Sequence, residues 1–122
     1  MARILVIDDQ AEIRDVVVAM LAAAGHVLTE APHGIIGLAL HREQLFDLVI
    51  SDLDMPMMDG IATISELTRS SPGTPIIAMS GGAGPEGKAA LGAGARAFLS
   101  KPFRRAELLE AVDDAFAPAR AA

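Results

Sequence analysis

Cysteine, tryptophan and tyrosine are absent from this chain of 122 residues. Without cysteine the chain can form no disulfide, no thiolate metal site and no cysteine nucleophile. Phenylalanine occurs only four times, too rarely for the stacking platform on which single-stranded nucleic acids bind. Basic residues are also scarce, because 10 lysines and arginines face 16 acidic residues and leave a net charge of −6. We therefore expect no direct contact with nucleic acid, whose phosphates need clustered basic residues.

Long hydrophobic runs are missing as well. The first run, Ile4–Ile7, is interrupted by Asp8 and Asp9 before it reaches the length of a signal-peptide core. The longest, Val16–Ala24, is far shorter than the roughly 20 residues that span a bilayer. We expect a cytoplasmic protein without membrane association. With 52% hydrophobic and 21% charged residues, the composition predicts one packed domain over residues 1–122, ending in a frayed tail at 117–122.

Five short runs of apolar residues alternate with longer stretches of helical period. The runs predict strands at Ile4–Ile7, Val27–Glu30, Leu48–Ser51, Ile76–Met79 and Ala97–Leu99. Helices are predicted over residues 13–24, 32–40 and 60–70, after Pro85, and over residues 104–116. In the last of them, four residues are expected to face the core: Leu108, Leu109, Val112 and Phe116. The alternation predicts an α/β fold with helices on both faces of a parallel sheet.

Polar residues follow four of the predicted strands. Asp8 and Asp9 follow the first strand, Asp52 the third, Ser80 the fourth, and Lys101 lies shortly after the fifth. The carboxyl ends of parallel strands share one edge of a sheet, and open α/β sheets bind ligands at that edge. We therefore expect three carboxylates, a hydroxyl and an ammonium group to converge there.

Three crowded carboxylates repel one another unless a cation lies among them. Oxygen ligands without cysteine or paired histidines favour Mg²⁺ or a similar ion. A metal beside an ammonium and a hydroxyl group suits a phosphoryl group, because both cations offset its negative charge. An aspartate can itself act as the nucleophile and form an acyl phosphate. The pattern thus predicts metal-dependent phosphoryl chemistry.

Each of these residues also has a purely structural interpretation. Asp9 and Glu12 have the spacing of a capping box at a helix start. Asp52 and Asp59 can be turn residues, and Lys101 an exposed lysine before a proline. Complementary groups at four strand ends favour a joint site over these separate explanations. The histidines lack a chelating spacing, and we expect solvent around each of them: His26, His33 and His41.

Taken together, the chain resembles the receiver domain of two-component response regulators from Ala2 to about Phe116. The resemblance rests on Asp8-Asp9 after the first strand, Asp52 at the start of DLDMPMMDG, Ser80 after IIAM, and Lys101 within FLSKPF. It implies a flavodoxin-like fold, a doubly wound sheet of five parallel strands in the order 2-1-3-4-5 with five helices. It also implies a phosphoacceptor switch rather than an enzyme, with at most self-phosphorylation and autodephosphorylation chemistry.

The resemblance further assigns partners and roles to single residues. The phosphoryl donor would be a sensor histidine kinase or a histidine phosphotransfer protein, and the signal would pass to a downstream protein target. Asp52 would accept the phosphoryl group, while Lys101 pairs with its oxygens and the Ser80 hydroxyl bonds one of them. The peptide bond between Lys101 and Pro102 is expected to be cis.

A magnesium ion is implied by the same resemblance. Asp9 and Asp52 would bind Mg²⁺ through their carboxylates and Asp54 through its backbone carbonyl. Asp8 would hold a water molecule of the metal's coordination shell. Asp54 also lies two residues beyond the acceptor, at a variable position of the family where phosphoryl lifetime is tuned.

Phosphorylation adds about −1.5 to −2 charges, and the resemblance implies a change of conformation in response. Ser80 would move inward and Phe98 would turn from an outward to an inward rotamer, altering the surface of the fourth helix, fifth strand and fifth helix. Phe98 replaces the tyrosine common at this position, so no phenolic hydroxyl contributes. Residues 81–94 hold six of the eleven glycines, which predicts a short and poorly held fourth helix.

The first predicted helix carries a hypothesis of its own. From Val16 to Ala24 it is apolar on all sides, whereas a surface helix usually keeps a polar face. Val18 and Ala22 lie off the inward stripe, and we expect them to be exposed and to dock against the phosphoryl donor. The alternative is that alanine is there only as a good helix former.

Two other functions remain open from the sequence. Asp52-Leu53-Asp54 resembles the D-x-D pair of haloacid-dehalogenase-type phosphatases, although Pro56 replaces the expected threonine or valine. The motif also ends the third predicted strand rather than the first, and a cap domain has no room in 122 residues. The third possibility is an interaction module that resembles a receiver and is never phosphorylated. The joint presence of the acidic residues, Ser80 and Lys101 disfavours it.

Overall fold

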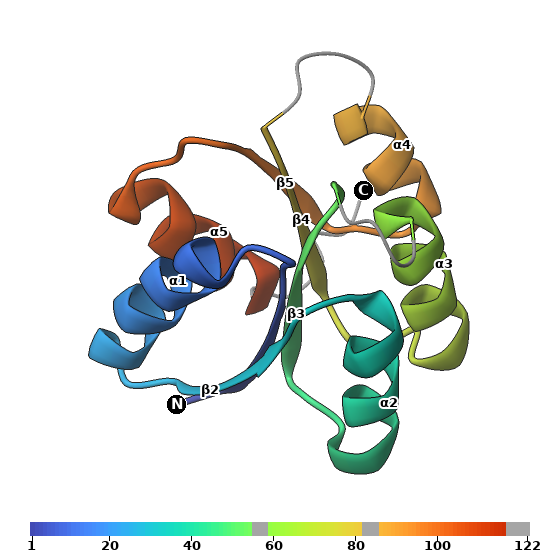
Figure 1. The fold of residues 1–122 in the computed structure, drawn as a ribbon, viewed down its shortest axis with the longest axis horizontal. Helices are drawn as coiled ribbons and strands as arrows, with labels where there is room; N and C mark the ends of the chain where they lie inside the picture. The colour runs from blue at the N-terminus through green and yellow to red at the C-terminus, as the bar shows by residue number, and fades with distance from the viewer. Residues whose placement is uncertain (55–58, 82–85, 117–122) are drawn as a thin grey trace.

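The computed structural model describes residues 1–54, 59–81 and 86–116 (Figure 1). Five strands, β1 (Arg3–Ile7), β2 (Val27–Ala31), β3 (Leu48–Asp52), β4 (Ile76–Ser80) and β5 (Ala97–Ser100), form one sheet. Every pairing is parallel, and the strand order is β2-β1-β3-β4-β5. The described helices are α1 (Ala11–Ala23), α2 (Gly34–Gln44), α3 (Gly60–Ser70), α4 (Glu86–Ala93) and α5 (Arg105–Phe116). The predicted fold class and strand order are confirmed, whereas Pro85 and the tail at 117–122 lie outside the described residues.

Helices cover both faces of the sheet, α1 and α5 on one side and α2, α3 and α4 on the other (Figure 1). Successive residues of a strand point to opposite faces, so β1 supplies Ile4 and Val6 to one core and Leu5 and Ile7 to the other. The central strands β3 and β4 are buried along their whole length. Burying one such branched side chain contributes about 1.5–3 kcal/mol, and the buried strands hold their carboxyl ends at a fixed edge.

Helix α1 presents a different outer face from the one predicted. Val17 and Leu21 are buried, and the buried stripe is centred between them. With about 3.6 residues per turn, Val18 lies on the flank of that stripe, where it is half-buried and packs against the core of that face. The prediction that Val18 is exposed is therefore wrong, whereas Ala22 is exposed as predicted. Val16, which lies further round the helix, is 49% exposed.

Two further predictions about side-chain placement are wrong. Phe116 is 42% exposed, and Ala115 is buried in its place, because the buried positions of α5 continue the Leu108 and Val112 spacing to residue 115. His41 is buried rather than solvated. Its Nδ1 accepts a hydrogen bond from the Phe46 backbone N–H at 3.1 Å, and its Nε2 lies 3.1 Å from the Ser71 hydroxyl. Burial lowers the pKa of His41 below its ordinary value.

Helix α4 is short, as the glycine-rich segment predicted, with eight residues from Glu86 to Ala93. Within the described ranges, no helix has both the length and the apolar character that crossing a membrane requires.

Candidate functional site

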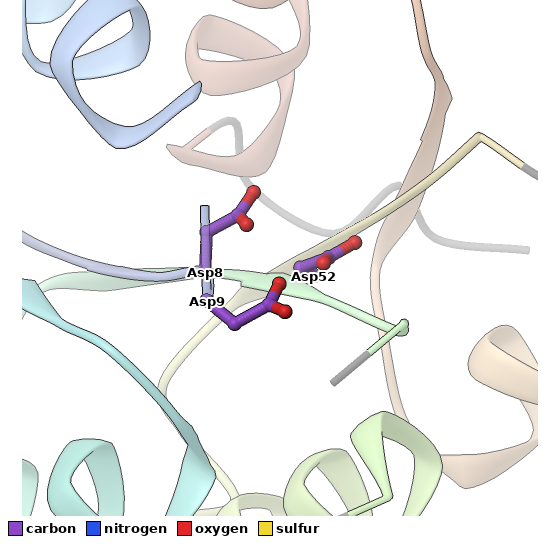
Figure 2. A group of neighbouring side chains, drawn as sticks. All are labelled: Asp8, Asp9 and Asp52. Carbon is purple, nitrogen blue, oxygen red and sulfur yellow. The ribbon is translucent and has the colours of Figure 1, made fainter. Parts of the chain in front are cut away.

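Three aspartates gather at the carboxyl edge of the sheet, as predicted. Asp8 and Asp9 follow β1, Asp52 ends β3, and β1 and β3 are neighbours in the sheet. Each residue offers a carboxylate oxygen, and these oxygens lie within 4.8 Å of one another (Figure 2). Asp8 and Asp52 are buried, whereas Asp9 is exposed to solvent. The cluster is thus open on the side of Asp9 and enclosed behind it.

Lys101 lies between two of these carboxylates. Its Nζ is 3.1 Å from Asp8 Oδ2 and 3.1 Å from Asp52 Oδ1. The backbone N–H of Lys101 donates to the Ser80 carbonyl at 2.8 Å, which fixes the loop after β5 beside the end of β4. The Lys101–Pro102 peptide bond is cis, as the resemblance implied.

The pKa values at the site reflect this crowding. Burial, followed by the nearby Asp8 carboxylate, raises the pKa of Asp52 from 3.8 to about 6, although Lys101 and a backbone hydrogen bond at Asp54 act in the opposite direction. Burial alone would lower the pKa of Lys101, but the Asp52 and Asp8 carboxylates raise it above its ordinary value. Burial and the Asp8 carboxylate together make an ionised Asp52 costly even with Lys101 beside it.

Backbone contacts hold Asp8 in place. Its Oδ1 accepts a hydrogen bond from the Gln10 N–H at 2.9 Å, and its own N–H donates to the Ala31 carbonyl at 3.1 Å. The Arg14 guanidinium donates to the Asp8 carbonyl at 2.6 Å. Gln10, not Asp9, is the N-cap of α1 and makes no side-chain capping bond. The capping-box interpretation of Asp9 is therefore wrong, and its carboxylate is left to the cluster.

The start of α3 packs closely on the end of β3, which sequence reasoning missed. A Cβ atom at Gly60 would lie 2.3 Å from Leu53 Cα and 2.8 Å from the Asp52 carbonyl oxygen. Only glycine allows this approach of backbone to backbone. Asp59 is the N-cap of α3, and its Oδ1 accepts a hydrogen bond from the Ile61 N–H at 2.9 Å. The Asp-Gly pair of the motif was the available signal, but Asp59 caps a helix and Asp52 ends β3, so neither is merely a turn residue.

Ser80 ends β4 with its side chain buried. Its hydroxyl donates to Asp54 Oδ2 at 3.0 Å and also contacts Glu86 Oε2 at hydrogen-bond distance. Asp54 is exposed and Glu86, the first residue of α4, is half-buried. Sequence reasoning missed Glu86, because no motif marks it.

Phe98 lies one strand further along the sheet, in β5. Its side chain is half-buried and packs against the core beneath α2, α3 and α4. A Cβ atom at Gly87 in α4 would come within 3.1 Å of Phe98 Cδ2. The ring therefore lies against the first turn of α4.

A doubly wound parallel sheet with an acidic cluster and a half-buried lysine at its carboxyl edge defines a class of α/β domains that bind their ligand at that edge. The chain belongs to one family of that class, since the response regulator receiver domain matches residues 4–113. It is a receiver domain, a phosphoacceptor switch of two-component signalling. Membership also implies interaction with a histidine kinase or a phosphotransfer partner.

Individual relatives agree with this assignment. The chemotaxis protein CheY of Bacillus subtilis is 35% identical over 91% of this chain and 94% of its own length. The solved structure of the chemotaxis response regulator CheY4 of Vibrio cholerae has a TM-score of 0.89 and 32% identity, over 95% of this chain and 99% of that one. The transcriptional regulatory protein GlrR of Escherichia coli is 35% identical over 93% of this chain. The chain spans only 26% of that regulator's length.

Proposed function

We propose that Asp52 is the residue that accepts the phosphoryl group. The observation that carries this proposal is the position of Lys101, whose ammonium lies 3.1 Å from Asp52 Oδ1. An Asp52 oxygen would attack phosphorus, the P–N bond of a phosphohistidine would break, and its electron pair would return to the imidazole nitrogen. Lys101 would offset the charge of the transferred group, and the Ser80 hydroxyl would donate a hydrogen bond to it.

The acidic cluster fits a magnesium ion. Its three carboxylates supply hard oxygen ligands, and burial, followed by the Asp8 carboxylate, makes an ionised Asp52 costly unless a cation lies nearby. Asp9, Asp52 and the backbone carbonyl of Asp54 would bind the ion, and Asp8 would hold one of its waters. When bound, Mg²⁺ would offset negative charge on the phosphoryl oxygens. The switch would therefore depend on a divalent cation.

Phosphorylation itself provides the test. The protein is incubated with acetyl phosphate and Mg²⁺, and intact-mass spectrometry counts the phosphoryl groups added. We expect one group on the wild type and none on Asp52→Asn or without divalent cation. Asp59→Asn is the matched control, because asparagine caps a helix as well as aspartate does, and it should still be phosphorylated. An unmodified wild type would refute the proposal and favour the interaction module that is never phosphorylated.

We infer that α1 docks against the phosphoryl donor through Val16 rather than through Val18, because Val16 is exposed and Val18 is half-buried. An apolar groove of about 310 Å³ is lined by α1 residues and by the loop after β5: Ile13, Val16, Val17, Met20, Lys101, Pro102 and Phe103. Because Lys101 lines this groove and also contacts Asp52, a donor that delivers a phosphoryl group to Asp52 would cover it. We infer that the apolar side of a histidine-bearing helix occupies the groove.

Comparing a protein donor with acetyl phosphate distinguishes docking from the phosphoryl transfer itself. We expect Val16→Asp to slow transfer from a phosphorylated histidine phosphotransfer protein at least about tenfold, since a charge would be buried against an apolar partner. Phosphorylation by acetyl phosphate should stay at the wild-type rate. Ala22→Asp changes an exposed residue of the same helix outside the groove and tests how far the docking surface extends. Equal rates for Val16→Asp and wild type with the protein donor would refute docking at the groove.

The remaining parts of the proposal concern the downstream target and the switch. We infer that a protein target binds the surface of α4, β5 and α5, and that Phe98 and Ser80 change conformation on phosphorylation. We infer no direct binding to nucleic acid, in keeping with the net charge of −6. We also infer a cytoplasmic location. Steady turnover of a phosphomonoester, rather than one stable adduct, would instead favour the phosphatase alternative.

A further inference from the structure

Glu86 connects the start of α4 to the phosphorylation site. Its Oε2 contacts the Ser80 hydroxyl, which also donates to Asp54 Oδ2 at 3.0 Å. Ser80 is buried at the end of β4, whereas Glu86 belongs to a different element, the helix that follows. The three side chains come from three separate segments of the chain. The Ser80 hydroxyl therefore ties the first turn of α4 to the end of β4.

The carboxylates of Asp54 and Glu86 compete for the single hydrogen of the Ser80 hydroxyl. A serine hydroxyl carries a single hydrogen, so it can donate to only one acceptor at a time. A phosphoryl group on Asp52 would be a third acceptor, and it would bring about −1.5 to −2 charges next to Asp54 and Glu86. Because like charges repel, the Ser80 hydroxyl cannot donate a hydrogen bond to the phosphoryl group while both carboxylates remain in place.

We propose that Glu86 is a positioning residue, which holds the Ser80 hydroxyl in the resting protein and leaves it when Asp52 is phosphorylated. The proposal rests on the proposed role of Asp52 as phosphoacceptor. Asp54 is exposed and can turn its carboxylate into water. Glu86 is half-buried and begins a helix, so its departure removes a contact that holds the first turn of α4. Phosphorylation is thereby converted into a displacement of α4.

A second contact in the same turn extends this path to β5. Gly87 follows Glu86 directly, and a Cβ atom at position 87 would lie 3.1 Å from Phe98 Cδ2. The first turn of α4 thus contacts Ser80 through Glu86 and lies against the ring of Phe98 through Gly87. When Glu86 leaves Ser80, the surface that supports one side of the Phe98 ring moves with it. Phe98 therefore responds to phosphorylation through α4.

Hydrogen exchange tests the contact in the resting protein. The amides of Ala90 and Leu91 report on the first turns of α4, and they are measured without any phosphoryl donor. Charge-assisted hydrogen bonds are about twice as strong as neutral ones, so Glu86→Gln should speed exchange about fivefold, and Ser80→Ala at least as much. The double variant should exchange no faster than Ser80→Ala, because Ser80→Ala already removes the contact that Glu86→Gln weakens. Unchanged exchange in α4 would refute the proposal, whether or not Asp52 is phosphorylated.

The matched control is Glu43→Gln, which removes the same charge from an exposed position near the far end of α2. It should leave exchange in α4 at the wild-type rate. If Glu43→Gln accelerated exchange in α4 as much as Glu86→Gln does, the effect would come from net charge. The proposed role of the contact between Glu86 and Ser80 would then be refuted.

Fluoroberyllate with Mg²⁺, a phosphoryl analogue, tests the displacement. We expect Glu86→Gln to bind it about fivefold more tightly than the wild type does, because a neutral side chain releases Ser80 more easily. In the Ser80→Ala background, Glu86→Gln should give no gain. An equal gain in both backgrounds, or none in either, would refute the proposal while leaving the phosphoacceptor role intact. If the wild type binds no fluoroberyllate and takes no phosphoryl group from acetyl phosphate, the proposed function itself fails.

Discussion

The ammonium of Lys101 lies 3.1 Å from a carboxylate oxygen of Asp52, across 49 positions of the sequence. The same nitrogen is 3.1 Å from Asp8 Oδ2. Because β1, β3 and β4 are consecutive in the sheet and β5 follows, the loop after β5 can reach across the end of β4 to both carboxylates. The lysine therefore reduces the repulsion between two buried acids and also stands beside the proposed acceptor oxygen.

Replacing Lys101 by methionine separates these two roles. We expect the rate of phosphorylation by acetyl phosphate to fall about 100-fold or more, since the loss of one preorganised contact to a developing charge typically costs that much. Binding of Mg²⁺ at pH 8, measured by calorimetry, should persist or strengthen, because a neighbouring positive charge has been removed. Lys88→Met, at an exposed lysine of α4, should change neither quantity. A parallel loss of Mg²⁺ binding and rate would show that Lys101 only maintains the structure.

Asp52→Asn should stabilise the protein in the absence of divalent cations. The pKa of Asp52 is raised to about 6 in the folded protein, from 3.8, so the folded state binds more protons than the unfolded state between those values. The free energy of unfolding therefore falls as the pH rises through this window and stays reduced above it. At pH 7.5 with a chelator, the variant should be more stable by at most about 3 kcal/mol.

Urea unfolding of both proteins at pH 4 and pH 7.5 measures this effect. The difference should shrink towards pH 4, where Asp52 is increasingly neutral in both states. Excess Mg²⁺ at pH 7.5 should also reduce it, because the ion binds the folded wild type and stabilises it. A variant that is less stable than the wild type at pH 7.5 with chelator would contradict the raised pKa.

His41 makes stability depend on pH in the opposite direction. Burial lowers its pKa below 6.5 in the folded protein, so the unfolded state binds more protons once the pH falls below 6.5. The contribution is complete above pH 6.5 and is lost as the pH falls towards the lowered pKa of the folded state. As the pH is lowered from 7.5 to 5, we expect the urea midpoint of the wild type to fall relative to that of His41→Gln. Identical changes would mean that His41 titrates normally when folded.

The positions of Asp8, Asp52 and Lys101 could be predicted from the sequence for a physical reason. In a parallel sheet every strand delivers its carboxyl end to one edge, so residues far apart in the chain converge once the strands are recognised. The central strands β3 and β4 are the easiest to recognise, because burial on both faces requires apolar residues along most of their length. The fold class and the acidic cluster follow from that pattern, whereas the strand order was implied by the resemblance to receiver domains.

Other features depend on packing that no local pattern records. Val18 flanks the buried stripe of α1 because the stripe is centred between Val17 and Leu21, and a helix that is apolar on all sides does not indicate its centre. His41 is buried through contacts with residues outside its own helix. Glu86 reaches Ser80 only because α4 starts beside the end of β4. These contacts are properties of the assembled layers.

Gly60→Ala should destabilise the protein and disturb the end of β3, which carries Asp52. Alanine is favoured over glycine in a helix by about 1 kcal/mol, but its Cβ would lie 2.3 Å from Leu53 Cα, which is backbone and cannot rotate away. Overpacking of this kind costs about 3 kcal/mol, so the steric effect outweighs the helix propensity. We expect a net loss of about 2 kcal/mol in urea unfolding, together with slower phosphorylation of Asp52.

The control for this prediction is Gly92→Ala in α4, where nothing lies within 4 Å of the added Cβ atom. That change should be neutral or stabilise the protein by up to about 1 kcal/mol, since only helix propensity acts. Phosphorylation by acetyl phosphate should stay at the wild-type rate in Gly92→Ala. If Gly60→Ala matched Gly92→Ala in stability, the close approach of α3 to the end of β3 would not restrict position 60. The predicted effect of this packing on the phosphorylation of Asp52 would then be wrong.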